Sequence, residues 1–126
     1  MIGLIDTSVF VGIEAARLNL SVLPAQVAVS VVTLAELRLA VLLASDVSTR
    51  QRRLSTLQLA SSLDPMPIDV GVAEEWARVI AELRQMGRRA PVNDIWVAAT
   101  AIRNSIAVIT QDSDFDAISG LELVRI

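Results

Sequence analysis

The chain has 126 residues, a length typical of one domain, so we expect a single domain over residues 1–126. Cysteine and histidine are absent, which excludes disulfide bonds, thiolate or imidazole metal sites, and catalysis by a histidine base. All eleven basic residues are arginine, which excludes lysine Schiff bases and Walker-type phosphate loops. The net charge of −3 does not favour nucleic-acid binding by the whole surface, although a local basic patch is compatible with it.

Apolar residues make up 53% of the chain, and they are spread along it rather than gathered in one block. No apolar run approaches the roughly 20 residues that a bilayer span requires, and the first residues lack the basic start of a signal peptide. We therefore expect a cytoplasmic protein that does not associate with a membrane. So much apolar area on a short chain also suggests a surface that a partner covers.

Two short strands are predicted in the first part of the chain. Residues 2–5 form an apolar run, and the polar residues 6–8, Asp-Thr-Ser, follow it directly. Residues 9–18 have the composition of a helix, and a second strand is predicted over residues 27–29. Polar side chains therefore stand where a buried strand ends and a helix begins.

Two helices are expected next. The first, over residues 33–44, is apolar on most faces, and Thr33 followed by Glu36 fits a capping box at its start. The second, over residues 48–63, is amphipathic and can be capped by Asp46. Three arginines stand near the start of this second helix: Arg50, Arg52 and Arg53.

A third strand and another long helix follow. Residues 66–68 predict a short strand, and Asp69 is placed to cap a helix over residues 70–86, whose apolar residues recur at helical spacing. Gly87 fits the end of that helix because glycine readily adopts the left-handed conformation found there. The basic loop that comes next contains two adjacent arginines, Arg88 and Arg89.

The stretch from Pro91 to Phe115 gathers acids around a short apolar run. A helix is predicted to begin near Asn93, a favourable N-cap residue, which leaves Asp94 less needed for capping. Residues 107–109 predict a buried strand, and residues 121–126 are expected to add an edge strand. Three oxygen-bearing side chains follow the buried strand at every second position: Thr110, Asp112 and Asp114.

Short apolar strands that alternate with longer helices predict an α/β domain with a mostly parallel sheet. In such open sheets, ligands bind beyond the carboxyl ends of the strands. Asp6 follows the first predicted strand and Asp112 follows a late one. We therefore expect these acids to converge if the two strands are parallel neighbours.

The acids of this chain suit one kind of cofactor. Four places can supply carboxylates to a common site: Asp6, Glu36, Asp94, and the pair Asp112 and Asp114. Carboxylates without histidine or cysteine match the oxygen ligands that Mg²⁺ and Mn²⁺ prefer, and such a site can activate water and neutralise a phosphodiester. Each acid also has a structural interpretation as a cap, a capping-box partner, a helix-dipole partner or a turn residue. Their coincidence at the ends of elements favours a common site.

Four short motifs occur along the chain in a characteristic order. They are Asp6-Thr7-Ser8, Thr33 with Glu36-Leu37, Asn93-Asp94 at the start of a helix, and Thr110, Asp112, Asp114 and Phe115 after a strand. At these separations they resemble the PIN-domain family, and more narrowly the VapC-type toxins of bacterial toxin–antitoxin pairs. The similarity covers essentially the whole chain. It implies a three-layer α/β/α domain with a central, mostly parallel sheet of four or five short strands.

The resemblance implies a Mg²⁺- or Mn²⁺-dependent endoribonuclease, a hydrolase of RNA phosphodiester bonds that a cognate antitoxin neutralises. Asp114 is a further candidate ligand, and Phe115 beside it is expected to pack. Carried onto this sequence, the catalytic, metal-binding quartet is Asp6, Glu36, Asp94 and Asp112. The supporting polar groups are Thr7, Ser8, Asn93 and Thr110.

Contacts to the RNA backbone must come from arginine because the chain has no lysine. Each candidate arginine could equally be a solvated surface group. Trp96 stands two residues after Asp94, and we expect it to pack in the core rather than to stack on bases. The candidate RNA-binding residues are Arg88, Arg89, Arg50, Arg52 and Arg53.

The resemblance also implies protein partners, namely a VapB-like antitoxin and a second copy of the chain in a homodimer. A basic side chain of the antitoxin would enter the acid cluster. The expected docking surface for the antitoxin is the pair of apolar helices over residues 33–44 and 48–63.

Three other interpretations stand beside this one. A phosphotransfer receiver domain requires a second acid after the first strand and a late lysine. A phosphatase of the haloacid dehalogenase type requires an acid at the position of Ser8. The third is a non-catalytic interaction module in which the acids serve only structure. One metal ion and two are both compatible with the pattern of acids.

Overall fold

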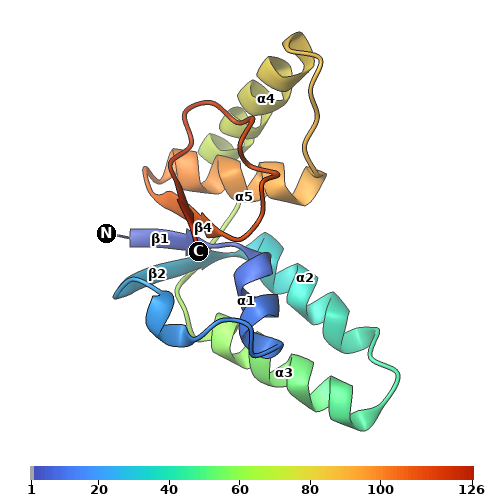
Figure 1. Ribbon diagram of the computed structural model, residues 1–126. Coiled ribbons are helices and arrows are strands. Elements are labelled where there is room, and N and C mark those ends of the chain that lie inside the picture. Colours follow the sequence, from blue (N-terminus) through green and yellow to red (C-terminus); the bar gives the residue numbers. More distant parts are fainter. Residues whose placement is uncertain (1) are drawn as a thin grey trace.

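The computed structural model describes residues 2–126 and contains a five-stranded sheet in the order β3-β2-β1-β4-β5 (Figure 1). All four neighbouring pairs of strands are parallel. The strands are β1 (Ile2–Ile5), β2 (Gln26–Ser30), β3 (Pro65–Met66), β4 (Ala107–Thr110) and β5 (Leu123–Arg125). The helices are α1 (Thr7–Glu14), the short 3₁₀ helix η1 (Leu20–Val22), α2 (Val31–Leu42), α3 (Val47–Ser61), α4 (Val70–Gln85) and α5 (Val92–Arg103).

Side chains alternate across the sheet, and this alternation builds two apolar cores. On one face, Leu4 and Val108 pack with buried residues of α4 and α5. On the other face, Ile5 and Ile109 pack with buried residues of α1, α2 and α3. Figure 1 shows α4 and α5 on one side of the sheet and the other three long helices on the opposite side. The predicted three-layer α/β/α fold with a central parallel sheet is therefore confirmed.

The two central strands bring distant parts of the sequence to one edge. Residues Gly3–Ile5 of β1 are in register with Ala107–Ile109 of β4, and the backbone N–H of Asp6 donates to the carbonyl of Ile109 at 2.9 Å. Gly3 leaves room for the side chain of Ile109, because a Cβ there would lie 2.4 Å from Cδ1 of Ile109. The residues that follow β1 consequently lie beside those that follow β4, as the sequence predicted.

Three of the predicted helix boundaries are confirmed by their capping contacts. Asp46 begins α3 by accepting a hydrogen bond from the backbone N–H of Thr49, and Asp69 begins α4 by accepting one from Val72. Gly87 follows the end of α4 with φ of +66°, the left-handed conformation that glycine adopts without steric cost.

The capping box predicted for α2 is wrong. The helix begins one turn earlier, at Val31, and its N-cap is Ser30, whose hydroxyl accepts from the backbone N–H of Thr33 at 3.2 Å. Thr33 therefore lies inside the first turn, where it cannot act as an N-cap. Glu36 is consequently not held by a capping box.

The N-cap predicted for α5 is also wrong. Asn93 lies within the first turn, and the N-cap position is occupied by Pro91, which offers no side-chain hydrogen bond. The fixed φ of proline, here −56°, suits the entry to a helix. The first backbone N–H groups of α5 are left without a side-chain cap.

Two predicted elements differ in extent. The first helix spans Thr7–Glu14 rather than residues 9–18, because the chain turns at Ala16, which has φ of +58°. The third strand spans Pro65–Met66 rather than residues 66–68, and it pairs only with the end of β2.

Trp96 packs between helices, as predicted. Its ring stacks on that of Trp76, with centroids 4.9 Å apart and an interplanar angle of 16°, which joins α5 to α4. Phe115 is fully buried, in agreement with its expected packing role. Among residues 2–126, no helix combines the length and apolar character needed to cross a membrane.

Candidate active site

Acids from four segments meet at the carboxyl-end edge of the sheet. Asp94, in the first turn of α5, experiences the charges of all the other acids proposed for the site. These others are Asp6 after β1, Glu36 on α2, and Asp112 and Asp114 in the loop after β4. The structure therefore places the five predicted carboxylates in one electrostatic neighbourhood.

Asp6 is the most deeply placed of these acids, with 2% of its surface exposed. It occupies the N-cap position of α1, yet its side chain makes no capping hydrogen bond. Instead, its Oδ2 accepts from the hydroxyls of Ser8 at 2.8 Å and Thr110 at 2.9 Å. Within residues 2–126 no group donates to Oδ1, so one carboxylate oxygen is free for a ligand.

Ser8 and Thr110 also fix the loop after β4. Thr110 is fully buried, and its Oγ1 accepts from the backbone N–H of Asp112 at 2.9 Å. Ser8 Oγ accepts from the backbone N–H of Gln111 at 3.2 Å. The same two hydroxyls that hold the Asp6 carboxylate therefore set the start of the segment that carries Asp112.

Glu36 is oriented by a hydroxyl from another element. Its Oε1 accepts from Thr7 Oγ1 at 2.7 Å, and that hydroxyl lies 3.1 Å from Oγ1 of the fully buried Thr33. Sequence reasoning assigned Thr33 to a helix cap and so missed its position behind Thr7. The contact joins the start of α1 to α2, a pairing that no local pattern reveals.

Burial and neighbouring negative charges raise the pKa values of two carboxyl groups at this edge, those of Asp94 and Asp112. Burial raises the pKa of Asp94 to about 7, and the charges of Asp6, Asp114, Glu36 and Asp112 add to the rise. Asp94 can therefore accept or release a proton near neutral pH while no cation lies among the acids.

Asp112 responds in the same direction. Burial, followed by the charges of Asp6 and Asp114, raises its pKa, while the guanidinium of Arg125 opposes the rise. Arg125 Nη2 also donates to the backbone carbonyl of Asp112 at 3.1 Å. Sequence reasoning missed Arg125, because only the pairing of β5 with β4 places it beside Thr110.

The donor set at this edge consists of oxygen atoms alone. Across residues 2–126, no three carboxylates already stand at the spacing of ligands to one ion. Mutual repulsion opposes that approach when the acids are ionised, and a cation among them removes the repulsion. Carboxylate oxygens are the ligands of hard divalent cations, so the chemistry of the residues fits Mg²⁺ or Mn²⁺.

Several predicted residues lie at the margin of this edge or away from it. Asn93 and Asp114 are exposed. Arg50 and Arg53 donate to the carbonyls of Ala44 and Ala40, so they tie α3 to the end of α2. In Figure 1 this end of the α2–α3 pair lies far from the sheet, and Arg52 belongs to the same turn of α3.

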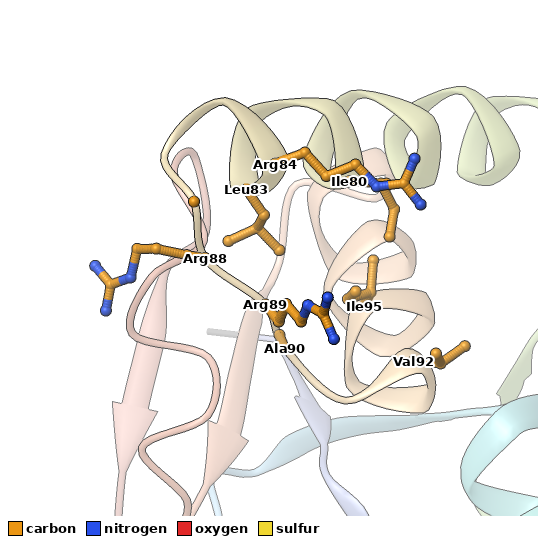
Figure 2. A pocket seen from close by; sticks show the side chains of 9 residues that line it. Ile80, Leu83, Arg84, Arg88, Arg89, Ala90, Val92 and Ile95 are labelled. Carbon is orange, nitrogen blue, oxygen red and sulfur yellow. The ribbon is translucent and has the colours of Figure 1, made fainter.

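Arg88 and Arg89 line a cavity of about 640 Å³ between the end of α4 and the start of α5 (Figure 2). Arg84, one turn earlier on α4, lines it too and was not singled out in the sequence. The cavity also touches Val92 and Ile95, which flank Asp94 on α5. A basic cavity thus adjoins the acidic edge of the sheet.

Comparison with known proteins gives four similarities. The PIN domain family matches residues 3–121 of this chain. Ribonuclease VapC4 of Mycobacterium tuberculosis is 48% identical over 128 aligned residues, which cover 98% of this chain and 95% of the relative. The structure of VapBC-5 from Mycobacterium tuberculosis, a member of the VapBC family of toxin-antitoxin systems, matches with a TM-score of 0.90 and 41% identity. That match covers 99% of this chain and 98% of the other. FitAcB from Neisseria gonorrhoeae matches with a TM-score of 0.76 and 30% identity, over 98% and 96% of the two chains.

Proposed function

The chain belongs to the PIN domain family, and on that basis we propose that it is an endoribonuclease toxin neutralised by a VapB-like antitoxin. The observation that carries this proposal is the edge of the sheet where the charges of four other acids act on Asp94. The similarity to a ribonuclease supports RNA as the substrate, and the similarity to a VapBC structure supports an antitoxin as partner. The proposed place of action is the cytoplasm.

The proposed cofactor is Mg²⁺ or Mn²⁺. Asp6, Glu36, Asp94 and Asp112 would hold it, with Asp114 as a further ligand, because they supply only oxygen donors and Asp6 Oδ1 is free. When bound, the ion supplies charge neutralisation for the scissile phosphate and activation of a water molecule.

Within this mechanism the chain's own hydroxyls position the acids. Ser8 and Thr110 hold Asp6 Oδ2, and Thr7 holds Glu36 Oε1, so neither carboxylate has to be ordered when the substrate arrives. Asn93, exposed on the first turn of α5, would face the RNA. Because the chain has no histidine, the proton of the attacking water passes to a carboxylate or to solvent.

The proposed antitoxin surface is the α2–α3 pair of helices. Large apolar side chains are exposed at and after the end of α2, an arrangement typical of a surface that a partner covers. They are Leu39, Leu42, Leu43 and Val47. A basic side chain of the partner would inhibit by pairing with the acids. A homodimer is the proposed assembly of the toxin.

The function can be tested with purified, partner-free protein. RNA is incubated with the protein in Mg²⁺ or Mn²⁺ and, separately, in EDTA. The same assay is run on Asp6→Asn and Asp94→Asn, with Asp64→Asn as the control because Asp64 is an exposed acid that precedes β3. We expect cleavage by the parent and by Asp64→Asn with metal only, and none by the two site variants.

Two results would contradict the proposal. Cleavage that persists in EDTA, or in both site variants, would exclude the metal site at these acids. A parent protein that cleaves no RNA under any metal condition would favour the non-catalytic interaction module instead.

A further inference from the structure

The cavity between α4 and α5 combines an apolar floor with a cationic rim. Its floor includes Leu83 and Ile95, which are buried, and Ile80 and Ala90, which are half-buried. Its rim carries Arg84 and Arg89, whose side chains extend toward α5 in Figure 2. At about 640 Å³ it falls within the size range of small-ligand sites. We call these six residues the α4–α5 pocket.

The arginines of this region have no acidic partner among residues 2–126. Arg78 forms ion pairs with Glu75 and Glu82, and Arg125 forms one with Asp116. No such pair involves Arg84 or Arg89, nor Arg88, which points to the opposite side of the loop in Figure 2. Three arginines without an acidic partner within six residues create a local positive potential, which favours binding of an anion.

The start of α5 adds a second source of positive potential. This helix has twelve residues, and its N-cap, Pro91, makes no side-chain hydrogen bond. Its first backbone N–H groups are unsatisfied donors at the positive end of the helix dipole. Val92 belongs to both this turn and the cavity lining, and Asp94 stands in the same turn. The pocket and the acidic edge therefore share one turn of helix.

RNA that reaches the carboxylates at this edge of the sheet needs nearby positive charge to offset their repulsion of its phosphates. The chain carries a net charge of −3, and five carboxylates face the proposed reaction site, so both repel a phosphodiester backbone. A cationic rim on a pocket that adjoins the turn of α5 with Asp94 offsets this repulsion and holds the strand. An apolar floor beside it suits the base or the ribose of the same nucleotide, and only a single strand can place one nucleotide in a cavity.

We propose that the α4–α5 pocket binds one nucleotide of a single-stranded RNA substrate next to the scissile bond. The phosphate is held by Arg84, Arg89 and the first turn of α5, and the base or ribose lies on the apolar floor. This inference rests on the proposed ribonuclease function, because it assigns a subsite of the same substrate. It adds Arg84, which the sequence pattern did not single out.

Binding is measured apart from cleavage, in protein that carries Asp6→Asn. Fluorescence anisotropy of a short labelled single-stranded RNA is followed for that protein and for versions that also carry Arg84→Gln or Arg89→Gln. Each substitution is expected to weaken binding roughly tenfold, the loss of one charge-assisted contact to phosphate. Each should also lower the slope of log affinity against log salt by about 0.7. The control is Arg17→Gln, an exposed arginine beyond the far end of α1, which should change neither quantity.

A substitution at Val92, an exposed residue that also lines the cavity, tests the same pocket without altering the buried core. Val92 is 62% exposed, so Val92→Glu adds a negative charge with little risk to folding. It should weaken RNA binding at least as much as the loss of one arginine. Circular dichroism melts of all variants check that the fold is retained.

The outcomes separate this inference from the proposed function. The pocket proposal is contradicted if RNA affinity is unchanged in both arginine variants and in Val92→Glu while the parent cleaves RNA. That result would leave the proposed ribonuclease function intact. If an acidic peptide competes as strongly as RNA of equal charge, the pocket is a protein-binding site and the proposal is also contradicted.

In the metal-loaded parent background, Arg84→Gln should raise KM and leave kcat nearly unchanged, because the contact exists before and during the reaction.

Discussion

The buried carboxylate of Asp6 depends on two hydroxyls from opposite ends of the chain. Thr110→Val keeps the shape of the side chain but removes the donor to Asp6 Oδ2 and the acceptor for the N–H of Asp112. We expect a loss of about 1–3 kcal/mol in the free energy of unfolding, because buried polar groups are left unpaired. RNA cleavage should fall at least about tenfold, since the acid is no longer fixed. Urea denaturation and a cleavage assay measure the two effects.

A second threonine provides the control for that substitution. Thr56 is also buried, and its hydroxyl donates to Glu14 and approaches the carbonyl of Arg52, away from the acidic edge. Thr56→Val should lower stability without lowering the activity of the folded fraction. Equal losses of activity in both variants would mean that Thr110 acts through stability alone.

Asp94 gives the metal-free protein a dependence of stability on pH. The pKa of this acid is raised to about 7 in the folded protein, above its unfolded value near 3.8. Between these values the folded state binds more protons than the unfolded state, so the free energy of unfolding falls as pH rises. The full cost is present above pH 7, and we expect about 1–2 kcal/mol after allowing for solvent screening of a half-exposed group.

Asp94→Asn tests this dependence by removing the charge. In EDTA, the variant should be more stable than the parent at about pH 8 and should lose the part of the pH dependence that lies between about pH 4 and pH 7. Chemical denaturation at several pH values measures the difference, with Asp64→Asn as the control. An unchanged pH profile in Asp94→Asn would show that repulsion at this edge is negligible. The gain in stability should accompany a loss of cleavage.

At the scale of elements, the ends of α1 and α4 are each followed by a residue in the left-handed conformation. Ala16 has φ of +58° after α1, and Gly87 has φ of +66° after α4. Ala16→Gly should raise the free energy of unfolding by roughly 0.5–1 kcal/mol, because alanine has the steric cost that glycine lacks. Gly87→Ala should lower it by a similar amount, since no atom lies within 4 Å of the new Cβ and only the backbone cost remains. Thermal melts compare the pair, and a shift of the same sign in both would contradict the argument.

The elements also differ in how far sequence alone predicted them. Asp46 and Asp69 cap their helices as expected, because a cap acts within four residues of chain. The same rule failed at Thr33 and Asn93, because Ser30 and Pro91 begin their helices earlier. At these two positions the exit of the chain from β2 and the rigid φ of proline decided the boundary.

At the scale of the whole molecule, an ion at the acidic edge should couple to folding. An ion that binds the folded state alone raises stability by RT ln(1 + [ion]/Kd), which is about 2.7 kcal/mol at one hundred times Kd. Mg²⁺ or Mn²⁺ should therefore raise Tm, and more at about pH 8 than at about pH 5, because more of the carboxylates are ionised. Differential scanning fluorimetry measures the shift, with NaCl at equal ionic strength as the control.

The rise in Tm should disappear in Asp6→Asn, which neutralises the most buried acid of the edge. A shift of the same size in Asp6→Asn would place the ion elsewhere on the protein. The first turn of α5 carries Asp94 and also lines the α4–α5 pocket. Because the two sites share this turn, binding of the ion should also change the affinity of the pocket for RNA.

The sequence by itself determined the fold class and the order of the elements, and it predicted which acids form the site. Apolar runs of three or four residues predict strands, and helical spacing predicts helices. Acids that directly follow neighbouring strands of a parallel sheet share one edge of that sheet. Only the tertiary structure decided which side chains hold those acids. The contacts of Thr7 with Glu36, of Thr110 with Asp6 and of Arg125 with Asp112 join residues that are distant in the chain. The α4–α5 pocket is likewise absent from any local pattern, because it forms only where α4 and α5 pack together beside three arginines that have no acidic partner among residues 2–126.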